Sequence, residues 1–197
     1  MTEALLVIDV QNEYFTGCLP VTYPPGSLEW ILDAMDAARA AHVPVIVVRH
    51  SNTAPGAAAF VPGTPGWELH PGMQARPRDL LIEKTLPGSF TGTRLGAWLE
   101  EHGIKKLVIA GYMTQMCCDT TARQALHRGY TVKFLSDATG TLTITNSAGT
   151  VRDADLHHAV LVVQQQRFSQ VMTAADWIRS LAPGRHGDFG GPGQQSR

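Results

Sequence analysis

The chain has 197 residues, of which 44% are hydrophobic and 17% are charged, and its formal net charge is −1. This composition excludes a disordered chain and suits one domain with a well-buried core. A charge so close to zero provides no electrostatic attraction to nucleic acid or to an anionic membrane. Three cysteines do not make a disulfide framework, so the reduced cytoplasm is the expected compartment.

The first predicted strand lies at residues 4–9 (ALLVID), a continuous apolar run that ends in a carboxylate. Such a run is typical of a central parallel strand that is buried on both faces. No basic segment precedes it, so we expect a strand and not a signal peptide. After a loop rich in Gly and Pro, Ser27 is expected to cap a helix with apolar residues at helical spacing. Residues 44–49 (PVIVVR) are the next predicted strand.

A long segment at residues 50–78 has no clear periodicity and is rich in Pro and Gly. Loops of this length in a compact domain are usually functional or disordered. Its aromatic residues Phe60 and Trp67 indicate an ordered loop. Residues 80–83 (LLIE) form the third predicted strand, which Lys84 follows at once.

The second half of the chain continues to alternate between helices and strands. The predicted elements are a helix capped by Thr91, a strand at 106–110, a helix at 114–129 capped by Thr114, a strand at 131–135, a helix that starts at Asp153 or a neighbouring residue, a strand at 167–169 and a helix near 173–181 capped by Thr173. This alternation predicts an α/β fold, a single-domain three-layer sandwich with a mostly parallel sheet of about six strands and helices on both faces. We expect the domain to span residues 1–182 and residues 183–197 to form a flexible tail of Gly, Pro and Gln.

Three reactive residues directly follow predicted strands or the turn after one: Asp9, Lys84 and Cys117. The carboxyl ends of parallel strands share one edge of the sheet, where α/β proteins bind their ligands. Cys117 also lies in the first turn of a predicted helix, where backbone N–H groups and the helix dipole favour a thiolate and can hold an oxyanion. The three residues together predict nucleophilic catalysis, in which Asp9 exchanges the thiol proton and the Lys84 charge holds both partners.

Other interpretations of these residues are less favoured. Cys118 lies about 100° around the helix from Cys117, so one thiol should face the site and the other the core. A non-catalytic or thiol-sensing protein on the same fold remains an alternative, although adjacent cysteines bridge only in a strained form. The turn after the first strand lacks the G-x-G-x-x-G of nucleotide- and flavin-binding proteins. The histidines have no metal-ligand spacing, so we expect no metal and no cofactor.

These motifs resemble the isochorismatase-like cysteine hydrolases, a superfamily that includes nicotinamidases and N-carbamoylsarcosine amidohydrolase. LLVIDVQNEYF is similar to the first strand of the family with its catalytic Asp, IEKTLPGSF to its Lys strand, and GYMTQMCCDTTARQA to its signature around the nucleophile. The register of the signature places the nucleophile at Cys117 and gives Cys118 the position of a Val. The resemblance also implies a cis peptide between Tyr112 and Met113, and an oxyanion hole formed by the backbone N–H groups of Met113 and Cys117.

The resemblance implies a reaction as well. It implies hydrolysis of a C–N bond in a small amide, carbamoyl or ureido compound through a thioester, by a homodimer or homotetramer. Nicotinamidases carry an Asp-x-His metal motif after the second strand, where this chain reads VVRHSNTAPG, so nicotinamidase activity is disfavoured. Hydrolysis of a vinyl ether with Asp9 as the acid is the alternative within the family, but members of that kind often lack the cysteine.

Substrate contacts are expected from aromatic residues near the strand ends. Four lie in loops that follow strands and one lies in the turn before the nucleophile: Phe15, Phe60, Trp67, Phe90 and Tyr112. Aromatic side chains of this kind line most small-molecule sites.

Overall fold

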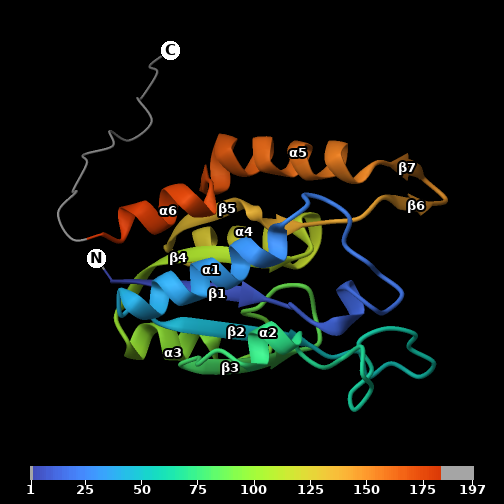
Figure 1. The fold of residues 1–197 in the computed structure, drawn as a ribbon, viewed down its shortest axis with the longest axis horizontal. Helices are drawn as coiled ribbons and strands as arrows, with labels where there is room; N and C mark the ends of the chain where they lie inside the picture. Colours follow the sequence, from blue (N-terminus) through green and yellow to red (C-terminus); the bar gives the residue numbers. More distant parts are fainter. Residues whose placement is uncertain (1, 183–197) are drawn as a thin grey trace.

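A computed structural model describes residues 2–182 of the chain, and the predicted tail at 183–197 lies outside the described residues (Figure 1). The middle layer is a six-stranded sheet with the order β3-β2-β1-β4-β5-β8. Its strands are β1 Thr2–Ile8, β2 Val45–His50, β3 Leu80–Lys84, β4 Ile104–Tyr112, β5 Thr131–Gly140 and β8 Gln170–Met172. Every neighbouring pair is parallel, which confirms the predicted fold class.

Helices cover both faces of the sheet (Figure 1). Helices α1 (Ser27–Ala40) and α6 (Ala174–Ser180) pack against the face that carries Leu5, and α3 (Leu95–Glu101) and α4 (Asp119–His127) pack against the face that carries Leu6. Because successive side chains of a strand point to opposite faces, β1 needs an unbroken apolar run to be buried between two layers. Each such side chain contributes about 2 kcal/mol when it leaves water.

The segment between β5 and β8 departs from the layered core. A hairpin of β6 (Ile144–Asn146) and β7 (Gly149–Val151) leads into α5 (Asp153–Val163), and Figure 1 shows these elements along one side of the molecule. The sequence did not predict the hairpin, whose strands are short and largely exposed. The short helical segments are η1 Asn12–Tyr14, α2 Pro71–Gln74, η2 Thr114–Cys118 and η3 Gln164–Phe168. Within residues 2–182, no helix is long and apolar enough to cross a bilayer.

Two of the predicted helix starts are wrong in detail. Ser27 is the first residue of α1 and Gly26 precedes it at φ 79°, while the Ser27 hydroxyl lies 3.0 Å from the Tyr112 hydroxyl. Helix α3 begins at Leu95, and its backbone N–H donates to Thr93 Oγ1, so Thr91 is not the cap.

The last helix and the last strand of the described residues lie closer to their predicted positions. Thr173 caps α6 as predicted, because its hydroxyl accepts a hydrogen bond of 3.1 Å from the backbone N–H of Asp176. The last strand lies at Gln170–Met172 and not at 167–169, because the preceding residues extend α5 by the π-helical turn η3.

Candidate active site

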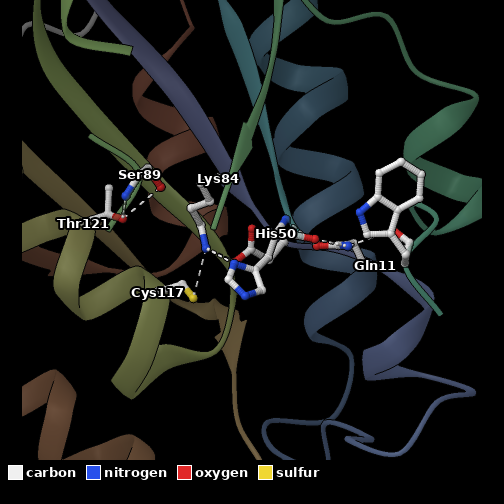
Figure 2. A network of polar contacts seen from close by, with 8 residues as sticks. Gln11, His50, Lys84, Ser89, Cys117 and Thr121 are labelled. Atoms are coloured by element: carbon white, nitrogen blue, oxygen red, sulfur yellow. Dashed lines mark hydrogen bonds and ion pairs between the residues drawn. The ribbon is translucent and has the colours of Figure 1, made fainter. Parts of the chain in front are cut away.

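The structure brings together the three reactive residues predicted from the sequence. Asp9 follows β1, Lys84 ends β3, and Cys117 lies in η2 after β4. Asp9 Oδ2 is 2.6 Å from Lys84 Nζ, and the same nitrogen is 3.3 Å from Cys117 Sγ (Figure 2). All three side chains are buried, with residue exposures of 0%, 2% and 5% for Asp9, Lys84 and Cys117.

Sheet topology explains this convergence. Strands β1 and β4 are neighbours, and the strand order reverses between them, so Asp9 and Cys117 lie at the switch point where α/β folds bind ligands. Lys84 belongs to β3, which is separated from β1 by β2. Two strand spacings amount to about 10 Å, so only a long side chain can reach Asp9 from that position.

The close approach of β1 and β4 restricts the backbone beside Asp9. Asp9 itself is in the left-handed region at φ 54°, which is uncommon for a residue with a side chain. Gly111 of β4 has φ 112°, and a Cβ there would lie 2.0 Å from the carbonyl oxygen of Ile8. Glycine at position 111 therefore allows the two strand ends to meet where the site is formed.

The ion pair fixes the charge on Lys84. Burial lowers the pKa of Lys84, but its contacts with the Asp9 carboxylate and the Cys117 sulfur outweigh burial and raise the pKa above its ordinary value. Within the described residues, neither carboxylate oxygen of Asp9 has a hydrogen bond of ordinary geometry, so the Lys84 ammonium is the close partner that compensates the buried charge. Lys84 is therefore a permanent cation at neutral pH.

The pKa of Cys117 is shifted upward, against the lowering expected from the helix N-terminus and the nearby cation. Burial raises the pKa of the Cys117 thiol, the Asp9 carboxylate raises it further, and the opposing charge of Lys84 does not cancel these effects. A thiol in these surroundings would need a base in order to act as a nucleophile. Asp9 is the carboxylate next to it that can take the proton.

The turn that carries Cys117 differs from the predicted capped helix. The implied cis peptide between Tyr112 and Met113 is confirmed, and η2 is π-helical. Thr114 does not cap it, because the Thr114 hydroxyl lies 2.9 Å from Nδ1 of His157 on α5. The backbone N–H of Cys118 donates to the carbonyl of Met113, five residues earlier, which is the hydrogen bond of a π-helical turn. That the N–H groups of Met113 and Cys117 form an oxyanion hole stays a prediction.

The two neighbouring cysteines have different surroundings. Cys118 is fully buried in the apolar cluster under α4, which also contains Ala122 and Phe134. Cys117 belongs to the same cluster, but its sulfur also lies 3.3 Å from the Lys84 ammonium. The prediction that one thiol faces the reactive groups and the other the core is confirmed.

Of the predicted aromatic contacts, Phe60 lies near the three reactive residues. Its ring centroid is 5.3 Å from that of His50, which contacts Lys84, and 5.1 Å from that of Tyr14. Trp67 is engaged elsewhere, because the guanidinium of Arg49 covers its ring at 3.5 Å. The Trp67 indole N–H donates to Ser51 Oγ at 2.7 Å, so this residue holds the loop.

The remaining predicted aromatic residues also have other partners. Phe90 stacks on Tyr130 at the far end of α4 with a centroid distance of 5.8 Å. Phe15 and Tyr112 line a cavity of about 220 Å³ at the start of α1, together with Ser27, and none of Asp9, Lys84 and Cys117 lines it. The sequence could not distinguish aromatic residues near the three reactive residues from those that pack elsewhere, because their partners come from distant parts of the chain.

His50 and Tyr14 are residues of the site that the sequence analysis missed. His50 ends β2 in register with Lys84, and its Nδ1 lies 3.3 Å from Lys84 Nζ (Figure 2). Tyr14 is buried, and burial together with the charges of Cys117 and Asp9 raises its pKa well above the ordinary value. The available signal for His50 was its place at the end of the strand VIVVRH, the same signal that identified Asp9 and Lys84.

A metal site is not evident in the described part of the chain. Among residues 2–182, no three His, Cys, Asp or Glu side chains gather as a metal ion would require. That the reaction needs no metal and no cofactor stays a prediction.

Comparison with known proteins places this site in a family. The family model of the isochorismatase domain matches residues 3–176. A crystal structure from Burkholderia xenovorans LB400, described as a candidate isochorismatase, superposes with a TM-score of 0.88 at 47% identity over 91% of this chain and 86% of that one. Nicotinamidase 3 of Arabidopsis thaliana is 32% identical over 90% of this chain and 88% of its own, and a streptothricin hydrolase of Streptomyces noursei is 37% identical over 75% and 58%. The chain is a hydrolase that belongs to the isochorismatase family.

Proposed function

We propose that this chain is a cysteine hydrolase that cleaves a C–N bond of a small amide, carbamoyl or ureido compound. The observation that carries the proposal is the position of one buried ammonium, Lys84 Nζ, against both Asp9 Oδ2 and Cys117 Sγ at 2.6 and 3.3 Å. A buried thiol beside a carboxylate and a fixed cation is the arrangement that nucleophilic catalysis needs. The similarity to a nicotinamidase, an enzyme named for hydrolysis of an amide, supports this class of substrate.

The reaction begins with a proton transfer. Asp9 takes the thiol proton while Cys117 Sγ attacks the carbonyl carbon, and the oxygen becomes an oxyanion near the backbone N–H groups of Met113 and Cys117. Asp9 then gives the proton to the leaving nitrogen, the C–N bond breaks, and ammonia or an amine departs. Lys84 keeps its charge throughout, because its pKa is raised by Asp9 and Cys117 despite burial, so the shuttled proton belongs to Asp9.

The second half of the reaction removes the acyl group. The acyl group is held on Cys117 as a thioester, and Asp9 takes a proton from a water molecule that attacks this carbonyl. The tetrahedral intermediate collapses, the C–S bond breaks, and the thiolate recovers its proton from Asp9. The products are a carboxylic acid and the starting thiol, so each group returns to its original state.

Vinyl ether hydrolysis with Asp9 as the acid is the second function that this family suggests. Such a reaction has no need of a nucleophilic sulfur. The contact between Lys84 and Cys117 therefore favours C–N hydrolysis.

A homodimer or homotetramer is part of the proposal. Large apolar side chains are exposed on the η2 turn, the hairpin and α5, among them Met116, Val151 and Val162, of which Val162 is 68% exposed. Light scattering on the purified chain measures the oligomeric state, and a monomer would contradict this part of the proposal.

A product assay tests the proposed reaction. Ammonia and pyruvate are measured across small amides, ureas, N-carbamoyl acids and isochorismate, with wild type, Cys117→Ala and Cys118→Ala side by side. We expect ammonia release that Cys117→Ala abolishes and that Cys118→Ala largely keeps. Pyruvate release from isochorismate that survives Cys117→Ala would instead identify ether hydrolysis led by Asp9.

A further inference from the structure

The Lys84 ammonium has no proton left for a substrate. Its nitrogen lies 2.6 Å from Asp9 Oδ2, 3.3 Å from Cys117 Sγ and 3.3 Å from His50 Nδ1. An ammonium has three N–H donors, and three neighbours surround it: two make hydrogen bonds and Asp9 forms an ion pair. We therefore expect a polar group of the substrate to find its hydrogen-bond donor elsewhere in the site.

The contact with Lys84 also determines the tautomer of His50. Lysine only donates, so Nδ1 of His50 must be the acceptor, and in the neutral ring the proton then lies on Nε2. Burial lowers the pKa of His50, and the Lys84 charge lowers it further, so the ring is neutral at pH 7. Within residues 2–182, Nε2 of His50 has no hydrogen-bond acceptor. It is also not one of the fully buried polar atoms that lack a partner, so it is open to a ligand.

The side chain of Gln11 fixes the backbone of His50 by two hydrogen bonds. The backbone N–H of His50 donates to Gln11 Oε1 at 2.8 Å, and Gln11 Nε2 donates back to the His50 carbonyl at 2.9 Å and to the Trp67 carbonyl at 2.8 Å. Gln11 is fully buried. Figure 2 shows the His50 ring beside Lys84 and Cys117, and the Phe60 ring packs against it at 5.3 Å. The position of the His50 ring is therefore set before any ligand arrives.

The charges around this donor are balanced. The charged groups that act on His50 are Lys84 and Asp9, which form an ion pair with each other. The neighbouring Arg49 has its guanidinium over Trp67 and 2.9 Å from Glu83 Oε2, and its buried Nε has no hydrogen-bond partner within residues 2–182. A carboxylate that entered the site would lose its hydration, and the two nearby cations of residues 2–182, Lys84 and Arg49, are each paired with a carboxylate already, so its entry is costly.

We propose that His50 determines specificity: its Nε2–H donates to an acceptor atom of the substrate held at Cys117, and the site selects uncharged amides over amides that carry a carboxylate. This inference rests on the proposed function, because it assigns a substrate class to the same site. His50 orients the ligand, and Asp9 and Cys117 carry out the chemistry.

A pair of alkylating agents tests the charge preference without the need for turnover. Iodoacetamide and iodoacetate differ in one group, a neutral amide or a carboxylate, and both alkylate a thiol. The rates of Cys117 modification are measured by peptide mass spectrometry in a Cys18→Ser background, and each is divided by its rate with glutathione. We expect the normalised rate to favour iodoacetamide by about tenfold or more. A normalised preference for iodoacetate would overturn the proposed selectivity.

Two substitutions of His50 distinguish its contact with the substrate through Nε2 from its contact with Lys84 through Nδ1. In His50→Gln the side-chain amide nitrogen reaches the place of Nε2, whereas in His50→Asn the amide oxygen takes the place of Nδ1. If Nε2–H holds the ligand, His50→Gln keeps the rate of Cys117 modification by iodoacetamide and His50→Asn lowers this rate by about tenfold. The reverse order would mean that His50 acts only by positioning Lys84 and would overturn the proposal. His102→Asn, at an exposed histidine that directly follows α3, is the control and should change neither rate.

This experiment distinguishes the inference from the proposed function. If no amide is turned over but the preference for iodoacetamide and the dependence of its rate on His50 are as expected, the proposed reaction fails and the assignment of His50 stands. If amides are hydrolysed through Cys117 while the alkylation rates are indifferent to charge and to His50, the proposed function stands and the inference fails.

Discussion

The hydroxyl of Thr114 lies 2.9 Å from Nδ1 of His157 and joins α5 to the turn that carries Cys117. His157 Nε2 lies 2.9 Å from the carbonyl oxygen of Ser136, which can only accept, so this nitrogen carries the proton. Nδ1 is then the acceptor, and Thr114 donates to it. The neutral ring of His157 is thus part of the support of η2, and protonation would remove the acceptor that Thr114 uses.

Acid is therefore expected to destabilise the protein through His157. Burial lowers the pKa of His157 from 6.5 to about 4, so between these values the unfolded chain binds a proton that the folded chain does not. The free energy of unfolding should fall by about 2 to 3 kcal/mol from this group as the pH falls through that window.

Urea unfolding at pH 7.5 and pH 4.5 measures this effect. His157→Gln should show a smaller difference between the two pH values than wild type. The exposed neighbour His158 provides the control, and His158→Gln should keep the wild-type difference. Equal pH dependence in wild type and His157→Gln would contradict the assignment.

The ion pair between Asp9 and Lys84 should show strong energetic coupling. Both side chains are fully buried, so Lys84→Met leaves an uncompensated carboxylate and is expected to cost about 3 to 5 kcal/mol of folding free energy. Asp9→Asn leaves a buried ammonium and should also be costly. The double variant should recover much of the loss, which a double-mutant cycle in urea measures. Additive effects would mean that the two charges do not compensate each other.

Gly111 is expected to be intolerant of a side chain. An added Cβ would lie 2.0 Å from the Ile8 carbonyl oxygen at a backbone φ of 112°, so Gly111→Ala should fail to fold or lose more than about 3 kcal/mol. Gly103 also has a positive φ, of 62°, but open space around its Cα, so Gly103→Ala is the matched control with a cost of about 1 kcal/mol. Thermal unfolding compares the two variants. A Gly111→Ala variant as stable as Gly103→Ala would show that β1 and β4 can separate.

The layered fold and the three reactive residues could be predicted because both depend on local signals. The apolar run of β1 requires a layer of helices on each face. A reactive residue at the carboxyl end of a parallel strand lies at the shared edge of the sheet, independently of the conformation of the loops. Asp9, Lys84 and Cys117 were identified in this way, and the cis peptide before η2 followed from the resemblance to the family.

The features that the sequence did not reveal depend on partners far along the chain. Ser27 and Thr114 have the side chains of helix caps, but Tyr112 and His157 engage their hydroxyls instead. Trp67 was expected at the substrate and is covered by Arg49. The helix N-terminus was expected to favour a thiolate at Cys117, but burial and the Asp9 carboxylate raise the pKa of this thiol. The sequence predicted Asp9 beside Cys117, but it did not reveal how deeply the thiol is buried.

The most direct test of the central claim is the mass of the enzyme during turnover. Wild type is mixed with the amide that gives the highest ammonia release, quenched in acid within milliseconds to seconds, and digested for peptide mass spectrometry, with Cys118→Ala as the control. We predict an acyl adduct on Cys117 in both proteins, formed and lost at rates that match turnover. Ammonia release without an adduct on Cys117, or with the adduct on Cys118, would contradict the account.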